Sequence, residues 1–178
     1  LNILVGELLE LAKLESPEIK IHPEPFNLGE LVQDVTQKFG LKAQKKNIAI
    51  ATHVPPGCVF VSADIGMIER VIENLLENAI HFAPTGESVD ITLKLEGTDV
   101  SVLVSDTGMG IAAEELPFIF DRFYQSDKDR SEDSDRGGLG LAIAKRILDL
   151  HHRSIRVKSR LNSGTTFAFK LPATGPTV

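Results

Sequence analysis

The segment from Asp64 to Phe82 constrains the fold of this chain more than any other. Drawn as a helix, at about 100° per residue, it gathers eight apolar residues on one broad face: Ile65, Ile68, Val71, Ile72, Leu75, Leu76, Ala79 and Phe82. A face of that width has to be buried. The segment therefore predicts a core helix that packs on a sheet or between other helices, and Pro84 ends it.

Four polar residues fall together on the opposite side of this expected helix: Asn74, Glu77, Asn78 and His81. A solvated face is one explanation. Asparagine, however, is a mediocre helix former, because its side chain competes for backbone hydrogen bonds. Amide oxygens beside a carboxylate also suit a magnesium ion that brings its own waters and phosphates. The residue types alone leave both interpretations open.

The rest of the pattern predicts further helices and strands in one α/β domain. We expect helices at 1–15, 27–40 and 139–150, and strands at 47–52, 58–61, 88–95, 100–105, 154–159 and 165–171. Asn27 and Glu30 resemble a capping box at the start of the second helix. In the first helix, leucines at 1, 4, 8 and 11 follow two heptads, which favours a partner helix; packing on its own domain is the alternative.

Charge and composition exclude several classes of protein. The net charge of −6 argues against a nucleic-acid binder, whose affinity would rest on a basic face. Cys58 is the single cysteine, so no internal disulfide can form, and no Cys/His cluster has zinc spacing. No apolar run approaches the ~20 residues of a membrane span. Residues 125–136 contain no apolar side chain, which predicts a mobile segment.

Two glycine-rich segments add to the polar helix face. Asp106-Thr-Gly-Met-Gly-Ile111 follows an expected strand, where a carboxylate can accept from an exocyclic amine and glycines allow close backbone approach. Gly137-Gly-Leu-Gly-Leu141 precedes a helix N-terminus, which favours phosphate. Each segment alone is as typical of a turn or hinge as of a ligand site. Neither matches a Walker A loop or a dinucleotide fingerprint.

Together, these motifs resemble those of the ATP-binding catalytic domain of sensor histidine kinases, in the GHKL superfamily. The matching segments are Asn74–Ala79 (N box), Asp106–Ile111 (G1 box), Phe118–Tyr124 (F box), Gly138–Ala142 (G2 box) and Ser163–Phe167 (the closing glycine–threonine motif). The resemblance implies an α/β (α+β) two-layer sandwich. Its mixed, mostly antiparallel sheet of about five strands would pack on three helices, with a lid at about 124–140.

The resemblance also implies a role for each matching position. For catalysis it implies Glu77 as general base, Asn78 as the magnesium ligand and Arg122 at the γ-phosphate. Asp106 would read the adenine amine, with Thr166 supporting it through water. The other nucleotide-binding residues implied are Asn74, His81, Gly108, Gly110, Ile111, Phe123, Gly138, Leu139, Gly140 and Leu141.

At the level of the whole protein, the resemblance implies that residues 1–22 are the end of a dimerisation helix with its linker. Residues 23–174 would be the catalytic domain and 175–178 a tail. None of the five histidines lies in a Ser-His-Glu-type motif, so the phosphate acceptor is expected on the adjoining dimerisation domain. The implied cofactors are ATP and Mg²⁺. The implied setting is the cytoplasmic part of a homodimeric bacterial inner-membrane kinase with a cognate response regulator.

Two alternatives stay open: a nucleotide-binding regulatory module without transfer activity, and a GHKL-type ATPase. Departures from the family pattern motivate the first. His81 stands where lysine is usual, Gln125 where a basic residue is frequent, and Arg136 where the lid has glycine. His151-His152-Arg153 replaces His-Gly-Gly, which predicts a non-glycine residue in a left-handed turn at a cost of about 1 kcal/mol.

A pH-dependent affinity follows from the histidine at position 81. Imidazole has an ordinary pKa of about 6.5, so it is only partly charged near neutrality. A phosphate contact would favour its protonated form, and the gain would fade as the ring deprotonates. We expect His81→Lys to bind Mg-ATP like the parent at about pH 6 and more tightly at about pH 8. Calorimetry tests this; parallel affinity–pH curves for the two proteins would show that His81 makes no such contact.

Overall fold

The computed structural model describes residues 2–126 and 137–175. Its helices are α1 (Asn2–Glu15), α2 (Leu28–Lys45), α3 (Ile65–Phe82) and α4 (Gly140–Leu150), with a 3-10 turn η1 (Leu116–Phe118). Its strands are β1 (Glu24–Asn27), β2 (Ala49–His53), β3 (Phe60–Ala63), β4 (Ser88–Glu96), β5 (Asp99–Asp106), β6 (Arg156–Ser159) and β7 (Thr165–Pro172). Most of the segment predicted to be mobile, 127–136, lies outside the described residues. No helix of the described ranges is long and apolar enough to cross a membrane.

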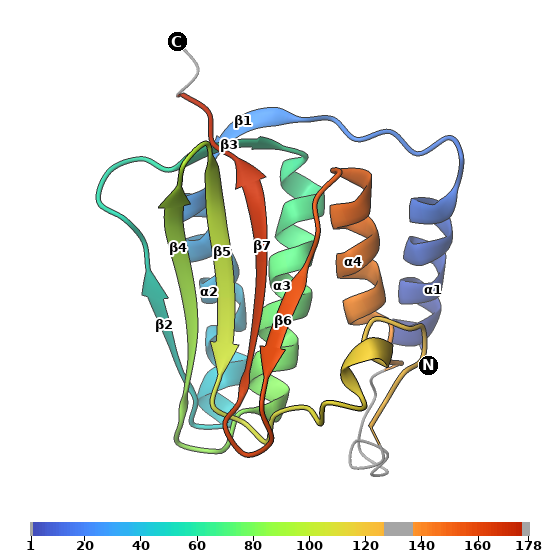
Figure 1. The fold of residues 1–178 in the computed structure, drawn as a ribbon, viewed down its shortest axis with the longest axis vertical. Coiled ribbons are helices and arrows are strands. Elements are labelled where there is room, and N and C mark those ends of the chain that lie inside the picture. The colour runs from blue at the N-terminus through green and yellow to red at the C-terminus, as the bar shows by residue number, and fades with distance from the viewer. Residues whose placement is uncertain (1, 127–136, 176–178) are drawn as a thin grey trace.

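The main sheet has five strands in the order β2-β4-β5-β7-β6. Strands β2 and β4 run parallel, and every other neighbouring pair is antiparallel. The helices lie on one side of this sheet (Figure 1), and α1 and α4 extend past its β6 edge. The predicted two-layer sandwich with a mixed, mostly antiparallel sheet is therefore confirmed.

A second, two-stranded ladder joins β1 to β3 at one end of the main sheet. Strand β1 was not expected, because Pro25 interrupts the short run that forms it. The strand expected at 58–61 lies in this ladder as β3, so the two strands on either side of the Pro55-Pro56-Gly57 turn belong to different sheets.

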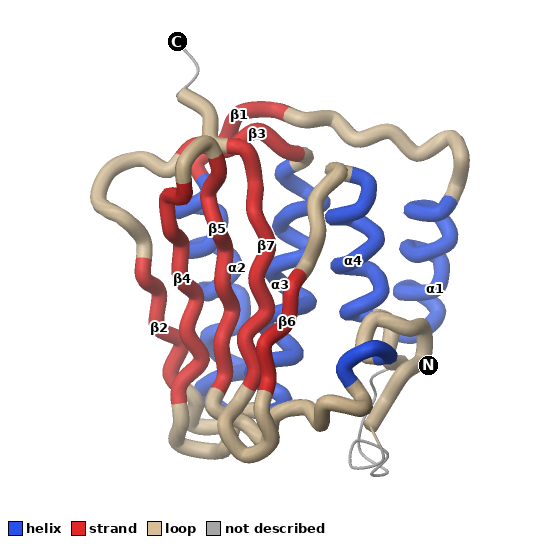
Figure 2. The backbone as a smooth tube through the Cα atoms, viewed as in Figure 1, coloured by secondary structure: helices blue, strands red, loops and turns tan. Residues whose placement is uncertain are grey.

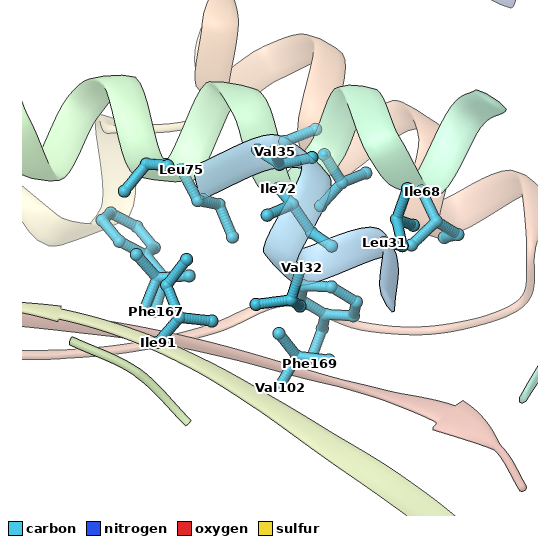
Figure 3. Close-up of a cluster of buried hydrophobic side chains, with 14 of the residues drawn as sticks. Leu31, Val32, Val35, Ile68, Ile72, Leu75, Ile91, Val102, Phe167 and Phe169 are labelled. Atoms are coloured by element: carbon cyan, nitrogen blue, oxygen red, sulfur yellow. The ribbon is translucent and has the colours of Figure 1, made fainter. Parts of the chain in front are cut away.

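The core lies between α3, α2 and the inner face of the sheet (Figure 3). Ile68, Ile72 and Leu75 of α3 are fully buried, and they point toward Phe167 and Phe169 of β7. Of the two interpretations left open for the polar residues of this helix, a solvated face does not hold for Asn74, because this residue is only 4% exposed. Its side chain lies next to Gly140, the first residue of α4.

Both ends of α3 are held by side chains. At the N-terminus, Asp64 accepts from the backbone N–H of Met67 at 3.2 Å and, with its other oxygen, from that of His22 at 2.9 Å. At the C-terminus, the Lys46 ammonium donates to the carbonyl of Ile80 at 2.9 Å. These bonds satisfy groups that the helix itself leaves unpaired, so the position of α3 along its axis is well defined.

Helix α1 packs on α4 of its own domain, which is the alternative allowed by its leucine spacing. Leu11 and Leu14 are buried, and Arg146 donates to the carbonyl of Leu14 at 3.0 Å. Arg70 of α3 holds both carboxylate oxygens of Glu10, at 2.9 and 3.1 Å. The same helix leaves Val5 and Leu9 exposed.

The turn after α4 contains the left-handed residue that the sequence predicted. His152 has φ of 54° and is exposed. A side chain in this conformation costs about 1–2 kcal/mol, because Cβ approaches the following carbonyl oxygen.

We predict that His152→Gly raises the free energy of unfolding by about 1 kcal/mol, the relief of strain being reduced by the greater freedom of glycine in the unfolded chain. Urea denaturation measures the change. His152→Ala is the matched control: it keeps Cβ and should bring no gain. An equal gain in both variants would show that the imidazole, and not the backbone, is the source.

Candidate functional site

A pocket of about 770 Å³ opens at one end of the domain. The C-terminal half of α3, the N-terminus of α4, the loop after β5 and the β6–β7 turn all reach this end (Figure 2). In Figure 1 it is the lower end of the molecule, to which α1 also contributes its first turns. Segments far apart in the sequence therefore form one wall.

The α3 side of the pocket consists of the polar residues singled out from the sequence. Asn74, Glu77, Asn78 and His81 all line it. The side-chain amide nitrogen of Asn74 is buried and has no hydrogen-bond partner among the described residues. Leaving such a donor unpaired costs about 1–3 kcal/mol. The wall therefore carries a polar group placed for a ligand rather than for the core.

Asp106, the last residue of β5, is a buried carboxylate with only 7% of its surface exposed. Its Oδ1 accepts from the backbone N–H of Gly108 at 2.8 Å. Burial raises the pKa of Asp106 above its ordinary value, whereas the backbone N–H groups of Gly108 and Thr165 oppose that shift. A carboxylate kept in so dry a place is a strong acceptor for any donor that reaches it.

The loop after Asp106 requires two of its glycines. A Cβ at Gly108 would lie 2.3 Å from the carbonyl oxygen of Phe82, so the loop touches the end of α3. Gly110 has φ of 68°, and a Cβ there would lie 2.0 Å from the carbonyl oxygen of Arg160. No other residue allows both approaches. The loop is thus held between α3 and the β6–β7 turn.

Ser159, on β6, ties this loop to the sheet. Its Oγ accepts from the backbone N–H of Ile111 at 2.7 Å and donates to the carbonyl of Gly164 at 3.0 Å. The hydroxyl oxygen of Thr165 lies 2.8 Å from Ser159 Oγ. One side chain therefore links the loop, the turn and β7. This role was not predicted, because a serine near a strand end is an ordinary turn signal.

Thr166 was expected to support Asp106, but the threonine that lies beside Asp106 is its neighbour, Thr165. Thr165 pairs with Asp106 in the strand register and lines the pocket. Thr166 instead lies within hydrogen-bond distance of Ser105, at 2.9 Å between the hydroxyl oxygens. Successive strand residues point to opposite faces of a sheet, so Thr166 cannot turn to the pocket side. Thr165, and not Thr166, therefore lies on the side of β7 that faces the pocket.

The segment that resembles the F box folds beside the pocket. Phe120 packs edge-on against Phe167, with ring centroids 6.2 Å apart. Phe123 has φ of 60°, is 54% exposed, and donates its backbone N–H to Gly138 at 3.1 Å. Arg122 forms an ion pair with Glu15 of α1.

The structure places nine of the predicted site residues in the pocket wall: Asn74, Glu77, Asn78, His81, Gly110, Ile111, Gly138, Gly140 and Leu141. Six predicted residues lie outside the wall: Asp106, Gly108, Arg122, Phe123, Leu139 and Thr166. Leu139 is fully buried in the core. Asp106 and Gly108 belong to the loop that shapes the wall.

Three wall residues come from helices that the motifs do not cover: Lys42 of α2, and Ile3 and Glu7 of α1. A signal for Lys42 was present in the sequence. Lysines at 38, 42 and 46 and glutamates at 69, 73 and 77 share a spacing of four residues, which is that of facing rows on two helices. No pattern indicated the contribution of α1.

Comparison with known proteins agrees with this arrangement. The family model described as histidine kinase-, DNA gyrase B- and HSP90-like ATPase matches residues 63–175. The sensor-like histidine kinase SenX3 of Mycolicibacterium smegmatis is 34% identical over 95% of this chain and 44% of its own length. The chain thus spans less than half of that relative.

Two solved structures give the same result. The full-length structure of ShkA in complex with AMPPNP has 28% identity, a TM-score of 0.85, and coverage of 99% of this chain and 36% of that chain. Histidine kinase ThkA in complex with the response regulator TrrA has 31% identity, a TM-score of 0.79, and coverage of 97% and 47%. The chain therefore belongs to the histidine kinase-, DNA gyrase B- and HSP90-like ATPase family, in its sensor histidine kinase branch.

Proposed function

We propose that this domain binds Mg-ATP in the pocket and transfers the γ-phosphoryl group to a histidine of an adjoining dimerisation domain. One observation carries the proposal. A single pocket brings together the polar residues of α3, the Met109–Ile111 end of the loop that follows Asp106, and the N-terminus of α4. These three segments are separated in sequence and supply, in turn, metal ligands, a base-reading loop and a phosphate-binding helix end.

Asp106 and its loop form the adenine end of the site in this proposal. The buried carboxylate accepts from the exocyclic amine, and Gly108 and Gly110 let the ring approach the backbone. Thr165, Asp106's partner in the strand register, takes the supporting role. Ser159 positions the loop through its bond to Ile111. The ShkA structure supports this use, because its complex contains the ATP analogue AMPPNP.

Asn78, with Asn74 one turn before it, is proposed to hold the magnesium ion. The fit rests on the chemistry of the wall: the side-chain amide oxygen of Asn78 can coordinate the ion. The buried amide nitrogen of Asn74, which has no partner among the described residues, can donate to a phosphate oxygen beside it. Within those residues, no three His, Cys, Asp or Glu side chains gather as a metal cluster. A site of this kind suits an ion that keeps its waters and is held largely by phosphates.

The phosphates are proposed to lie against the N-terminus of α4, at Gly138 and Gly140. Both glycines line the pocket, and α4 is a helix of 11 residues whose first N–H groups have no partner within the helix. Those groups and the helix dipole favour an anion. Leu141 completes this part of the wall.

Glu77, one residue before Asn78, is the proposed general base. In the transfer, a ring nitrogen of the acceptor histidine attacks the γ-phosphorus and the bond to the bridging oxygen of ADP breaks. The carboxylate of Glu77 takes the proton lost by the imidazole. The bound magnesium ion supplies charge neutralisation on the phosphates. The domain's main contribution is then position and charge.

The whole protein is proposed to be a homodimeric sensor kinase of the bacterial inner membrane with this domain in the cytoplasm, where residues 1–22 end the dimerisation helix. A cognate response regulator would receive the phosphoryl group, as suggested by the ThkA complex with TrrA. Assays separate the alternatives. Nucleotide binding without transfer to any supplied dimerisation domain would indicate a regulatory module, and release of free phosphate an ATPase.

The proposed adenine end of the site predicts the effect of Asp106→Asn. Mg-ATP and Mg-ADP should raise the melting temperature of the parent, and the variant should lose most of that shift, because the amide can present a donor to the adenine amine. Without nucleotide the variant should be at least as stable as the parent near neutral pH. The reason is the raised pKa of the buried carboxyl, which makes its ionisation a cost that grows as pH rises through that pKa.

Scanning fluorimetry at several pH values measures both effects. As the pH is lowered through the raised pKa of Asp106 toward the ordinary aspartate value of about 3.9, the parent's carboxyl group takes up a proton and the stability gap between the two proteins should narrow. An unaltered nucleotide shift in Asp106→Asn would show that Asp106 does not read the base.

The proposed general base predicts the effect of Glu77→Gln. It should slow transfer to a separately supplied dimerisation domain by about a hundredfold, a typical loss for a general base, while changing the affinity for Mg-ATP far less. Radiolabelled transfer and calorimetry measure the two quantities. The parent chain alone should acquire no acid-labile phosphate. Strong labelling of the chain by itself would contradict the proposed acceptor.

A further inference from the structure

The charge of the pocket wall is unfavourable for a triphosphate. Among the described residues that line it, the carboxylates are Glu7, Glu77, Glu114 and Glu115, and the one permanently charged cation is Lys42. A nucleoside triphosphate adds several further negative charges. Magnesium neutralises two of these negative charges, so we expect cationic side chains of the protein to neutralise part of the rest.

Two other cations of the described residues near the site are engaged elsewhere. Arg122 pairs with Glu15 and does not line the pocket. Lys46 donates to the carbonyl of Ile80 at the end of α3. His81 lines the wall but carries no fixed charge. Lys128 and Arg130, considered from the sequence as substitutes, lie outside the described residues.

Lys42 is one of three lysines that link α2 to α3. Lys38 bonds Glu69 and, at 3.0 Å, Glu73, and Lys42 pairs with Glu77. An ion pair of this kind at a surface contributes little to stability, so stabilisation of the fold is a weak explanation for the position of Lys42. Lys42 differs from Lys38 in one respect: it lines the pocket, and Lys38 does not.

The ammonium group of Lys42 is also free to move. Its side chain is 52% exposed, and a lysine head on its flexible stem can exchange one oxygen partner for another at low cost. Its present partner, Glu77, lies on the same wall as Asn78 and His81, one helical turn before the position where the family pattern has lysine.

We infer that Lys42 is a further substrate-binding residue of this site: its ammonium contacts the terminal phosphates of the bound nucleotide and supplies the charge that His81 does not. The inference rests on the proposed binding of Mg-ATP. In the absence of nucleotide, Glu77 holds the ammonium at the pocket wall, so the cation is already in place when the phosphates arrive.

The test compares Lys42→Met with Lys38→Met by calorimetry. Lys42→Met should weaken Mg-ATP binding by about tenfold, a typical loss for one charged hydrogen bond, and adenosine binding by less than about twofold. Lys38→Met removes a neighbouring ion pair of the same row but no pocket charge, and should bind both ligands like the parent. Lys42→Arg keeps the charge and should retain most of the affinity for Mg-ATP. Circular dichroism confirms that each variant is folded.

A Glu77→Gln background separates direct contact from an effect through Glu77. Lys42→Met should still weaken Mg-ATP binding there by about tenfold; no further loss would mean that Lys42 acts only by holding Glu77, which overturns the inference. Equal losses for adenosine and Mg-ATP would overturn it too, as would unchanged Mg-ATP affinity in Lys42→Met. A parent chain that binds no Mg-ATP would instead refute the proposed function itself.

Discussion

The burial of one face of α3 is the constraint on which the rest of the domain depends. This helix packs on β4 and β5 and is flanked by α2 and α4, so it can neither slide nor turn without opening the core. Its polar residues are therefore fixed in direction by apolar contacts on the other side of the same helix. A shift of one residue would turn the helix by about 100° and would carry Asn78 away from the pocket. Packing energy is thus what gives the site its geometry.

Asp106 shows the opposite relation between stability and function. Burying a carboxylate is unfavourable, and the raised pKa of Asp106 is the sign of that cost. Hydrogen bonds in the surrounding structure offset part of this cost. The N–H of Gly108 donates to the carboxylate, and Ser159 ties the same loop to β6 and β7. The group that destabilises the empty domain is held in place by bonds made elsewhere, as is common where a protein must keep a polar group ready for a ligand.

Local patterns in the sequence predicted most of the elements because apolar period and turn residues are local properties. The four helices and the five strands of the main sheet follow from such patterns. The left-handed turn at His152 was predicted instead from the His-Gly-Gly of the family pattern, which this chain replaces. The features that were not predicted depend on residues far away in the sequence. Strand β1 exists because β3 offers an edge to Pro25 and its neighbours, and the burial of Asn74 follows from how α4 and the sheet enclose α3.

The candidate site was predictable to the same extent and for the same reason. Motif spacing placed nine residues in the pocket wall, among them Asn78 and Gly140. The choice between Thr165 and Thr166 needed the register of β7 against β5, which no local pattern contains. To place Lys42 in the pocket wall, a prediction would have to know how α2 pairs with α3. To place Ile3 and Glu7 there, it would have to know how α1 packs on α4.

The position of β7 determines when the domain can come into existence. It lies inside the sheet between β5 and β6, although it is the last strand in sequence among the described residues. Its contact with β5 joins residues 61 positions apart, as between Ser105 and Thr166, and such distant pairings form slowly. A nascent chain that has produced β2, β4 and β5 therefore still exposes the apolar side of an incomplete sheet. Until Phe167 and Phe169 have emerged from the ribosome, the core lacks the two β7 side chains toward which α3 points, and the pocket lacks Thr165. Loss of β7 would therefore remove part of the core and part of the site together.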